Sequence, residues 1–246
     1  TDLILDASGE QMGRGHWISE TAQFTVHALG GSYTVTNLAG RAYGGAFVGQ
    51  VAVEPLPAGP DHRYVVRATL TNAELAGITA HRLRGDEPPP SGRVSLDLQI
   101  TGLVTDAFGP ATRGSGTLAV EDGALFRLPL LGGLSDLLSR MVPGLGFAAQ
   151  TDLTCSFIIA DGAIFTDDLM LAGDVISMRA DGEIEFDGRV DCRVEVQLLR
   201  RGPLAAILRF ITLPVTKLLE FQLSGTLDEP KWRPVNLPKE LFLIFD

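Results

Sequence analysis

The chain has 246 residues, of which 45% are hydrophobic, and a mean hydropathy of +0.19, so it has enough apolar residues to bury a core, which excludes a wholly disordered protein. It carries 30 acidic and 20 basic residues, and the resulting formal net charge of −10 argues against a nucleic-acid partner, since phosphate binding needs a basic surface. The 28 glycines and 14 prolines are typical of a chain with many reversals, as in β structure.

Alternation of apolar and polar residues is the dominant pattern along the chain. In 93–104, for example, Val94, Leu96, Leu98 and Ile100 share one parity, and polar residues occupy most of the other. Such a period of two predicts strands with one buried face and one wet face, typical of antiparallel sheets. The predicted strands lie within 47–53, 63–70, 93–104, 153–159, 176–186, 190–198 and 221–227.

Four Asp-Gly pairs mark changes of direction or register. The pairs at 122–123, 161–162 and 187–188 predict tight hairpins, because both residues tolerate a positive φ. The pair at 181–182 lies where the alternation continues unbroken, so it predicts a glycine bulge within one strand.

Two segments have helical spacing instead. The apolar residues of 128–142 recur at intervals of three and four, which predicts an amphipathic helix. The segment 202–219 is apolar around most of its circumference, with Leu204, Ile207, Leu208, Phe210, Ile211 and Leu218 among its large residues. Such a helix must be enclosed by protein or lipid, so it is either a buried core helix, or a plug or membrane contact.

These patterns predict a single domain, 1–246, of the α+β class and dominated by β structure. We expect a large twisted antiparallel sheet, forming a β-groove or half-barrel, that wraps one or two apolar helices. The first five residues lack the basic and apolar parts of a signal peptide, so we expect a processed chain or an excised fragment.

The sequence lacks the common enzymatic motifs. It has no nucleophile elbow, no phosphate-binding loop and no HExxH pattern, and its four histidines are far apart, so we expect no enzyme, no catalytic residue, no metal and no cofactor. Glu183, Glu185 and Asp187 share a strand face, which we interpret as solvated. Cys155 and Cys192 each lie on the apolar side of a predicted strand, so we expect both to be small core residues. A disulfide bond between them in an oxidising compartment is the alternative.

The region from about 114 to 234 resembles the C-terminal domain of the AsmA-like family of bacterial envelope proteins. The resemblance rests on GSGTLAVEDG (114–123), LPLLGGL (128–134), FIIADG (157–162) with LML (169–171), and FQLSGTLDEPKWRP (221–234). It implies a protein of the periplasm or cell envelope, with a parent chain anchored in the inner membrane, and a role in lipid transport or outer-membrane maintenance.

The resemblance also implies that phospholipid acyl chains are held or conducted on the apolar face of the sheet, between the inner and outer membranes. We therefore expect phospholipid or another apolar ligand as the partner, and possible contact with a membrane surface. The residues expected to line the lipid path are Val94, Leu96, Leu98, Ile100, Val190, Val194 and Val196. The alternative is a structural or interaction module with a closed core, which docks a partner envelope protein.

Overall fold

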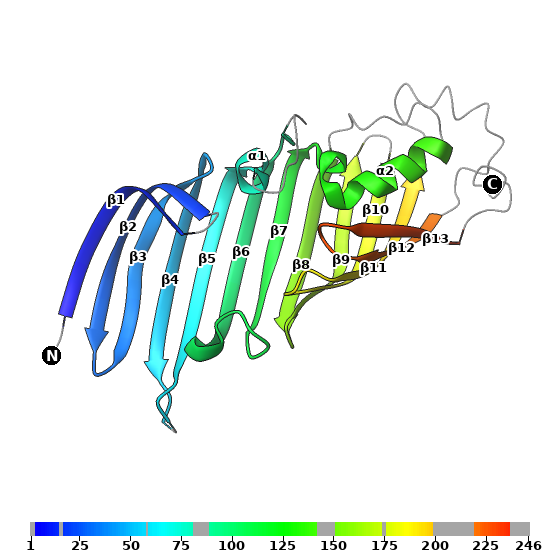
Figure 1. Ribbon diagram of the computed structural model, residues 1–246. Helices are drawn as coiled ribbons and strands as arrows, with labels where there is room; N and C mark the ends of the chain where they lie inside the picture. The colour runs from blue at the N-terminus through cyan, green and yellow to red at the C-terminus, as the bar shows by residue number, and fades with distance from the viewer. Residues whose placement is uncertain are drawn as a thin grey trace.

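The computed structural model describes residues 3–14, 17–57, 59–80, 89–141, 151–173, 176–198 and 219–236. They form one open antiparallel sheet of 13 strands, in which the spatial order is the order along the chain (Figure 1). The strands are β1 (Leu3–Arg14), β2 (Trp17–Leu29), β3 (Ser32–Ala42), β4 (Gly45–Pro55), β5 (His62–Glu74), β6 (Arg93–Leu103), β7 (Arg113–Gly123), β8 (Thr151–Ala160), β9 (Ala163–Gly173), β10 (Ile176–Glu185), β11 (Val190–Leu198), β12 (Leu219–Gly225) and β13 (Pro230–Asn236).

The prediction of a β-dominated fold with an antiparallel sheet is confirmed. Two short helices interrupt the meander, α1 (Leu75–Thr79) between β5 and β6, and α2 (Pro129–Met141) between β7 and β8. Helix α2 matches the predicted helix 128–142. The predicted helix 202–219 lies outside the described residues, so the second helix expected inside the sheet has no described counterpart.

The meander sends alternate connections to opposite ends of the strands. The connections β2–β3, β4–β5, β6–β7 and β8–β9 lie at one end, the lower end in Figure 1, which we call the turn end. Helices α1 and α2 lie at the other, which we call the helix end. Because antiparallel neighbours need only short connections, no long crossover is required.

The Asp-Gly pairs have the structures expected of them, with one exception. Asp161 and Gly162 have φ values of 50° and 80° and join β8 to β9, and Gly182 has φ 150° at a register shift in β10. The hairpin predicted at 122–123 is wrong. Asp122 has φ 50° but lies at a bulge near the end of β7, where its N–H donates to Asp152 Oδ1 at 3.0 Å. A positive φ suits a bulge as well as a hairpin, and the pair alone does not distinguish them.

Two asparagines produce similar bulges in the N-terminal half. Asn37 and Asn72 have φ values of 53° and 57°, where the register shifts in β3 and β5. Asparagine tolerates this left-handed conformation better than most residues, and a bulge bends a strand and increases its twist. The bulges therefore give these strands local curvature and explain why simple alternation fails within 32–42.

The main core lies between α2 and the C-terminal half of the sheet. Leu134 and Leu138 of α2 are 0% and 1% exposed, in the same cluster as Val196 and Phe221 of the sheet. Trp232 on β13 fixes the helix further, because its Nε1–H donates to the carbonyl oxygen of Leu130 at 2.8 Å. The helix thus covers one face of the sheet over its last strands (Figure 1).

The two edges of the sheet differ in their backbone donors. The outer strand β13 contains Pro230 and Pro234, neither of which has a backbone N–H. The other outer strand, β1, extends over 12 residues without a proline. The described sheet therefore has one blunted edge and one edge with all its donors in place.

Candidate functional site: a partly open apolar face

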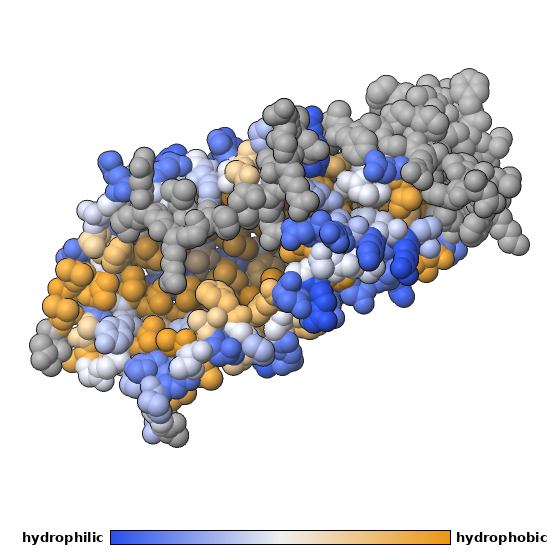
Figure 2. Space-filling view, viewed as in Figure 1, coloured by the Kyte–Doolittle hydropathy of each residue, from blue (hydrophilic) through white to orange (hydrophobic). Residues whose placement is uncertain are grey.

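One face of the sheet is apolar along its whole length. The strand register aligns Val35, Val51, Val66 and Ile100 in one row across β3 to β6, and Phe47, Leu70, Leu96 and Leu118 in the next row, across β4 to β7. Figure 2 shows hydrophobic side chains gathered and hollowed over the strands at the left of the view, which carry the N-terminal half of this face.

The cover over this apolar face differs between its two halves. Over β10 to β12 its buried residues share a core cluster with α2, whereas over β1 to β6 much of it stays partly open to solvent, with no described helix on its central part. Leu3 and Leu5 at the β1 edge are 59% and 53% exposed. We call the partly open residues the open apolar patch: Leu3, Leu5, Phe24, Val26, Val35, Val51, Val66, Leu96 and Leu98.

The lining residues predicted from the sequence are divided between the two halves. Leu96 and Leu98 lie in the open apolar patch. Val94, by contrast, is 6% exposed and joins the main core cluster, and Ile100 is 3% exposed in a second cluster with Tyr64 and Ile159. The remaining three, Val190, Val194 and Val196, are 4%, 1% and 0% exposed in the main core cluster.

The residues proposed as a plug or membrane contact are not part of this site as described. Leu204, Ile207, Leu208, Phe210, Ile211 and Leu218 lie outside the described residues. Within the described ranges, no helix is long and apolar enough to cross a membrane.

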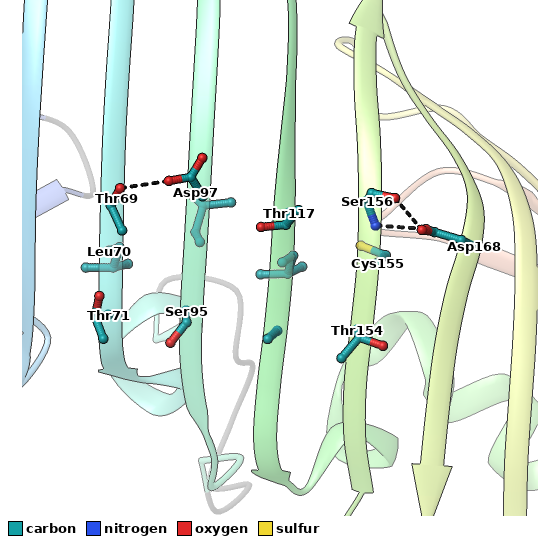
Figure 3. A pocket seen from close by; sticks show the side chains of 13 residues that line it. Thr69, Leu70, Thr71, Ser95, Asp97, Thr117, Thr154, Cys155, Ser156 and Asp168 are labelled. Carbon is teal, nitrogen blue, oxygen red and sulfur yellow. Dashed lines mark hydrogen bonds between the residues drawn. The ribbon is translucent and has the colours of Figure 1, made fainter.

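The opposite, polar face has two hollows. The smaller, of about 420 Å³, is lined in part by hydroxyl and carboxyl side chains, two pairs of which are hydrogen-bonded (Figure 3). Thr69 donates to Asp97 at 2.8 Å, and the backbone N–H of Ser156 donates to Asp168 at 2.8 Å. The Ser156 hydroxyl also donates to Asp168, and these two bonds lower the pKa of that carboxyl.

The larger hollow, of about 840 Å³, is acidic. Its lining includes the carboxylates of Asp97, Asp167, Asp181, Glu183 and Asp191, with Ile158 and Phe165 beside them. Asp191 accepts a hydrogen bond from Gln222. No group of three or more His, Cys, Asp and Glu side chains among the described residues is arranged to hold a metal ion. We interpret this hollow as part of the solvated face of the sheet.

Cys155 and Cys192 are both free thiols, partly buried. Burial raises the pKa of Cys192 from its ordinary 9.0 to about 11, with Asp191 adding to the effect, and burial is also the main cause of the raised pKa of Cys155. Both thiols are therefore protonated at neutral pH, which makes them poor nucleophiles.

The raised pKa of Cys192 predicts a pH dependence of stability. The folded state holds this proton more tightly than the unfolded state, so the stabilisation is complete below pH 9 and is lost as the pH rises towards about 11. Unfolding by urea between pH 7 and pH 10.5 should show the wild-type protein losing stability relative to Cys192→Ala above pH 9. Parallel curves for the two proteins would contradict the assignment.

No protein-family model matches the sequence, and neither a curated protein nor a solved structure was found to match it.

Sequence reasoning missed a group of exposed apolar residues at the turn end. Leu29, Tyr33 and Phe108 are 62%, 50% and 67% exposed. Leu29 and Tyr33 flank the Gly30-Gly31 pair, and Phe108 lies in the β6–β7 connection. An apolar residue beside turn residues was the available signal, but alternation shows only the face on which a residue lies, and the ends of strands and the connections are exposed whatever that face.

Proposed function

We propose that the protein is a non-enzymatic lipid-binding domain that holds phospholipid acyl chains on its open apolar patch. The observation that carries the proposal is that Val51, Val66, Leu96 and Leu98 lie on the same face of β4, β5 and β6 and stay partly open to solvent. Contiguous apolar surfaces of this extent on soluble proteins mark sites for partners, membranes or apolar ligands.

The size of the patch suits acyl chains. Strands lie 4.7–4.9 Å apart, so β1 to β6, which carry the patch, extend over about 24 Å. The hydrocarbon core of a bilayer is about 30 Å thick and contains two leaflets, so one phospholipid needs about 15 Å. Each CH₂ group moved from water onto an apolar surface contributes about 0.8 kcal/mol, which allows binding without a specific polar contact.

The finer parts of the proposal depend on the resemblance to AsmA-like proteins. In this proposal the sheet is a β-groove around α2, located in the periplasm of a bacterium and belonging to a parent chain anchored in the inner membrane. Phospholipid moves along the apolar face between the inner and outer membranes, or the domain supports outer-membrane maintenance. The half of the apolar face on which no helix is described supports such a path.

A second candidate is a structural or interaction module that docks a partner envelope protein. It is favoured by the closed half of the apolar face, where Val194, Val196 and Phe221 are at most 1% exposed and leave no room for a ligand. In this case the open patch is an interface for a protein and no lipid is bound.

Native mass spectrometry with lipid extraction separates the two candidates. We expect the wild-type protein to retain phospholipid, and Leu98→Asp to lose most of it, because a carboxylate in the patch must be desolvated when a chain binds. Gln99→Asp is the matched control, since Gln99 is the next residue of β6, on the polar face, and exposed. Val194 is unsuitable for this test, because it is 1% exposed and its replacement by Asp would unfold the core.

Lipid retention in Leu98→Asp equal to that in Gln99→Asp, with both variants folded, would refute the proposed site. Wild-type protein free of lipid, even after incubation with phospholipid vesicles, would favour the interaction module.

A further inference from the structure

The outer side of β1, which we call the β1 edge, presents a regular row of backbone groups (Figure 1). Among the described strands β1 has one neighbour, β2, and the two keep a single register from Leu3 to Arg14. In an antiparallel pair, every second residue of a strand points its N–H and C=O away from the partner strand. An outer strand in unbroken register is therefore a template for the backbone of a further strand.

The opposite edge of the described sheet carries features that discourage such pairing. Strand β13 contains Pro230, Lys231 and Pro234, and the register between β12 and β13 shifts after Glu220. Prolines, lysines and bulges are the devices by which natural sheets prevent the addition of strands at an edge. Strand β1 contains neither proline nor lysine, so one described edge is protected by these devices and the other is not.

The β1 edge exposes apolar side chains on both faces of the sheet. Leu3 and Leu5 lie on the apolar face at 59% and 53% exposure, and Ile4 lies on the opposite face at 61% exposure. A lipid or a protein packed on one face would cover either the two leucines or Ile4. A strand paired beside β1 places side chains next to all three, because its own side chains alternate between the two faces.

The charges of the β1 edge indicate the chemistry of that strand. Asp6 and Glu10 are exposed on the same face as Ile4, and the described side chains of β1 and β2 include no lysine or arginine. Opposite charges on paired strands are stabilising, whereas like charges are destabilising. A second copy of this chain, with its net charge of −10, would bring its own Asp6 and Glu10 to the edge. A strand with basic residues fits better.

We propose that the β1 edge binds a strand of a partner protein in which apolar residues alternate with lysine or arginine. The partner's backbone pairs with the outward N–H and C=O groups of β1, and its apolar residues lie beside Leu3 and Leu5. Its basic residues lie beside Asp6 and Glu10, and their alkyl stems cover Ile4. Strand addition of this kind takes its affinity from main-chain hydrogen bonds and its specificity from alternate side chains. The proposal does not depend on lipid binding.

A synthetic peptide that alternates valine and lysine over the length of β1 tests the proposal on the whole protein. We expect binding in isothermal titration calorimetry, and protection of every second amide of β1 from hydrogen exchange, followed by NMR. This alternate pattern is specific to strand addition, because the intervening amides already donate to β2. Glu10→Lys should lower the association constant about fivefold. A peptide with glutamate in place of lysine should bind this variant more tightly than the wild type.

Asp167→Lys is the matched control, because Asp167 is also exposed and the same change of charge is made on β9, far along the sheet. Absence of peptide binding to the wild type, binding without alternate protection of β1, or equal losses in Glu10→Lys and Asp167→Lys would overturn the proposal. Dimers of the wild type that show the alternate protection without peptide would also overturn it, since a second copy would then occupy the edge.

Discussion

Replacing Phe221 by alanine is expected to lower the free energy of unfolding by about 3–5 kcal/mol, the usual range for removing a buried aromatic side chain. Phe221 is 0% exposed and belongs to the main core cluster. It pairs in register with Val194 and Pro234, and the ring of Trp232 meets its own edge to face, with centroids 6.5 Å apart. Neighbours on this many sides cannot all collapse into the vacated space, so a cavity remains.

Equilibrium urea unfolding followed by circular dichroism measures this effect. Val48→Ala is the comparison, because a side chain with 54% exposure should change stability by no more than about 0.5 kcal/mol. Similar changes in the two variants would show that Phe221 does not occupy a packed core.

Introducing a carboxylate at Leu134 should detach α2 from the sheet. Leu134 is 0% exposed, and Leu→Ala changes at such sites cost about 2–5 kcal/mol. Leu134→Asp should exceed that range, because a charge buried without a partner adds its desolvation. Gly132→Asp on the same helix is the control, since a Cβ there has no atom within 4 Å apart from its chain neighbours and the backbone of its own helix.

Hydrogen exchange of the α2 amides and binding of a hydrophobic dye report on this detachment. We expect rapid exchange in α2 and strong dye binding for Leu134→Asp, and values close to wild type for Gly132→Asp. Retained protection of α2 in Leu134→Asp would show that the helix does not depend on this contact.

Much of the fold was predictable from local chemistry. Alternation in 93–104 identified β6 and its apolar parity, the 3, 4 spacing identified α2, and Asp161-Gly162 identified a hairpin. Each prediction depended on a rule of short range: the period of a strand, the period of a helix, or a positive φ. Strand β3 was missed because the bulge at Asn37 reverses the parity halfway along it.

The division of the apolar face into an open and a covered half was not predictable. Leu98 and Val194 have the same kind of alternating neighbours in sequence, yet the first is partly exposed and the second is 1% exposed. Alternation in the sequence shows which face of a strand is apolar. Whether that face is buried depends on where a distant element such as α2 packs. The same reason explains why Phe108 was overlooked, because its exposure follows from the anchoring of its loop on Tyr64.

The two outer strands of the described sheet differ in what they could offer to an added strand. A strand arriving at β13 finds positions without N–H donors at Pro230 and Pro234, whereas one arriving at β1 finds a continuous ladder of 12 residues beside Leu3 and Leu5. A strand added at β1 would extend the hydrogen-bonded sheet and its apolar face. A strand added at β13 would receive no backbone hydrogen bond from Pro230 or Pro234. The two edges of the described sheet therefore differ in how many backbone donors they offer to a further strand.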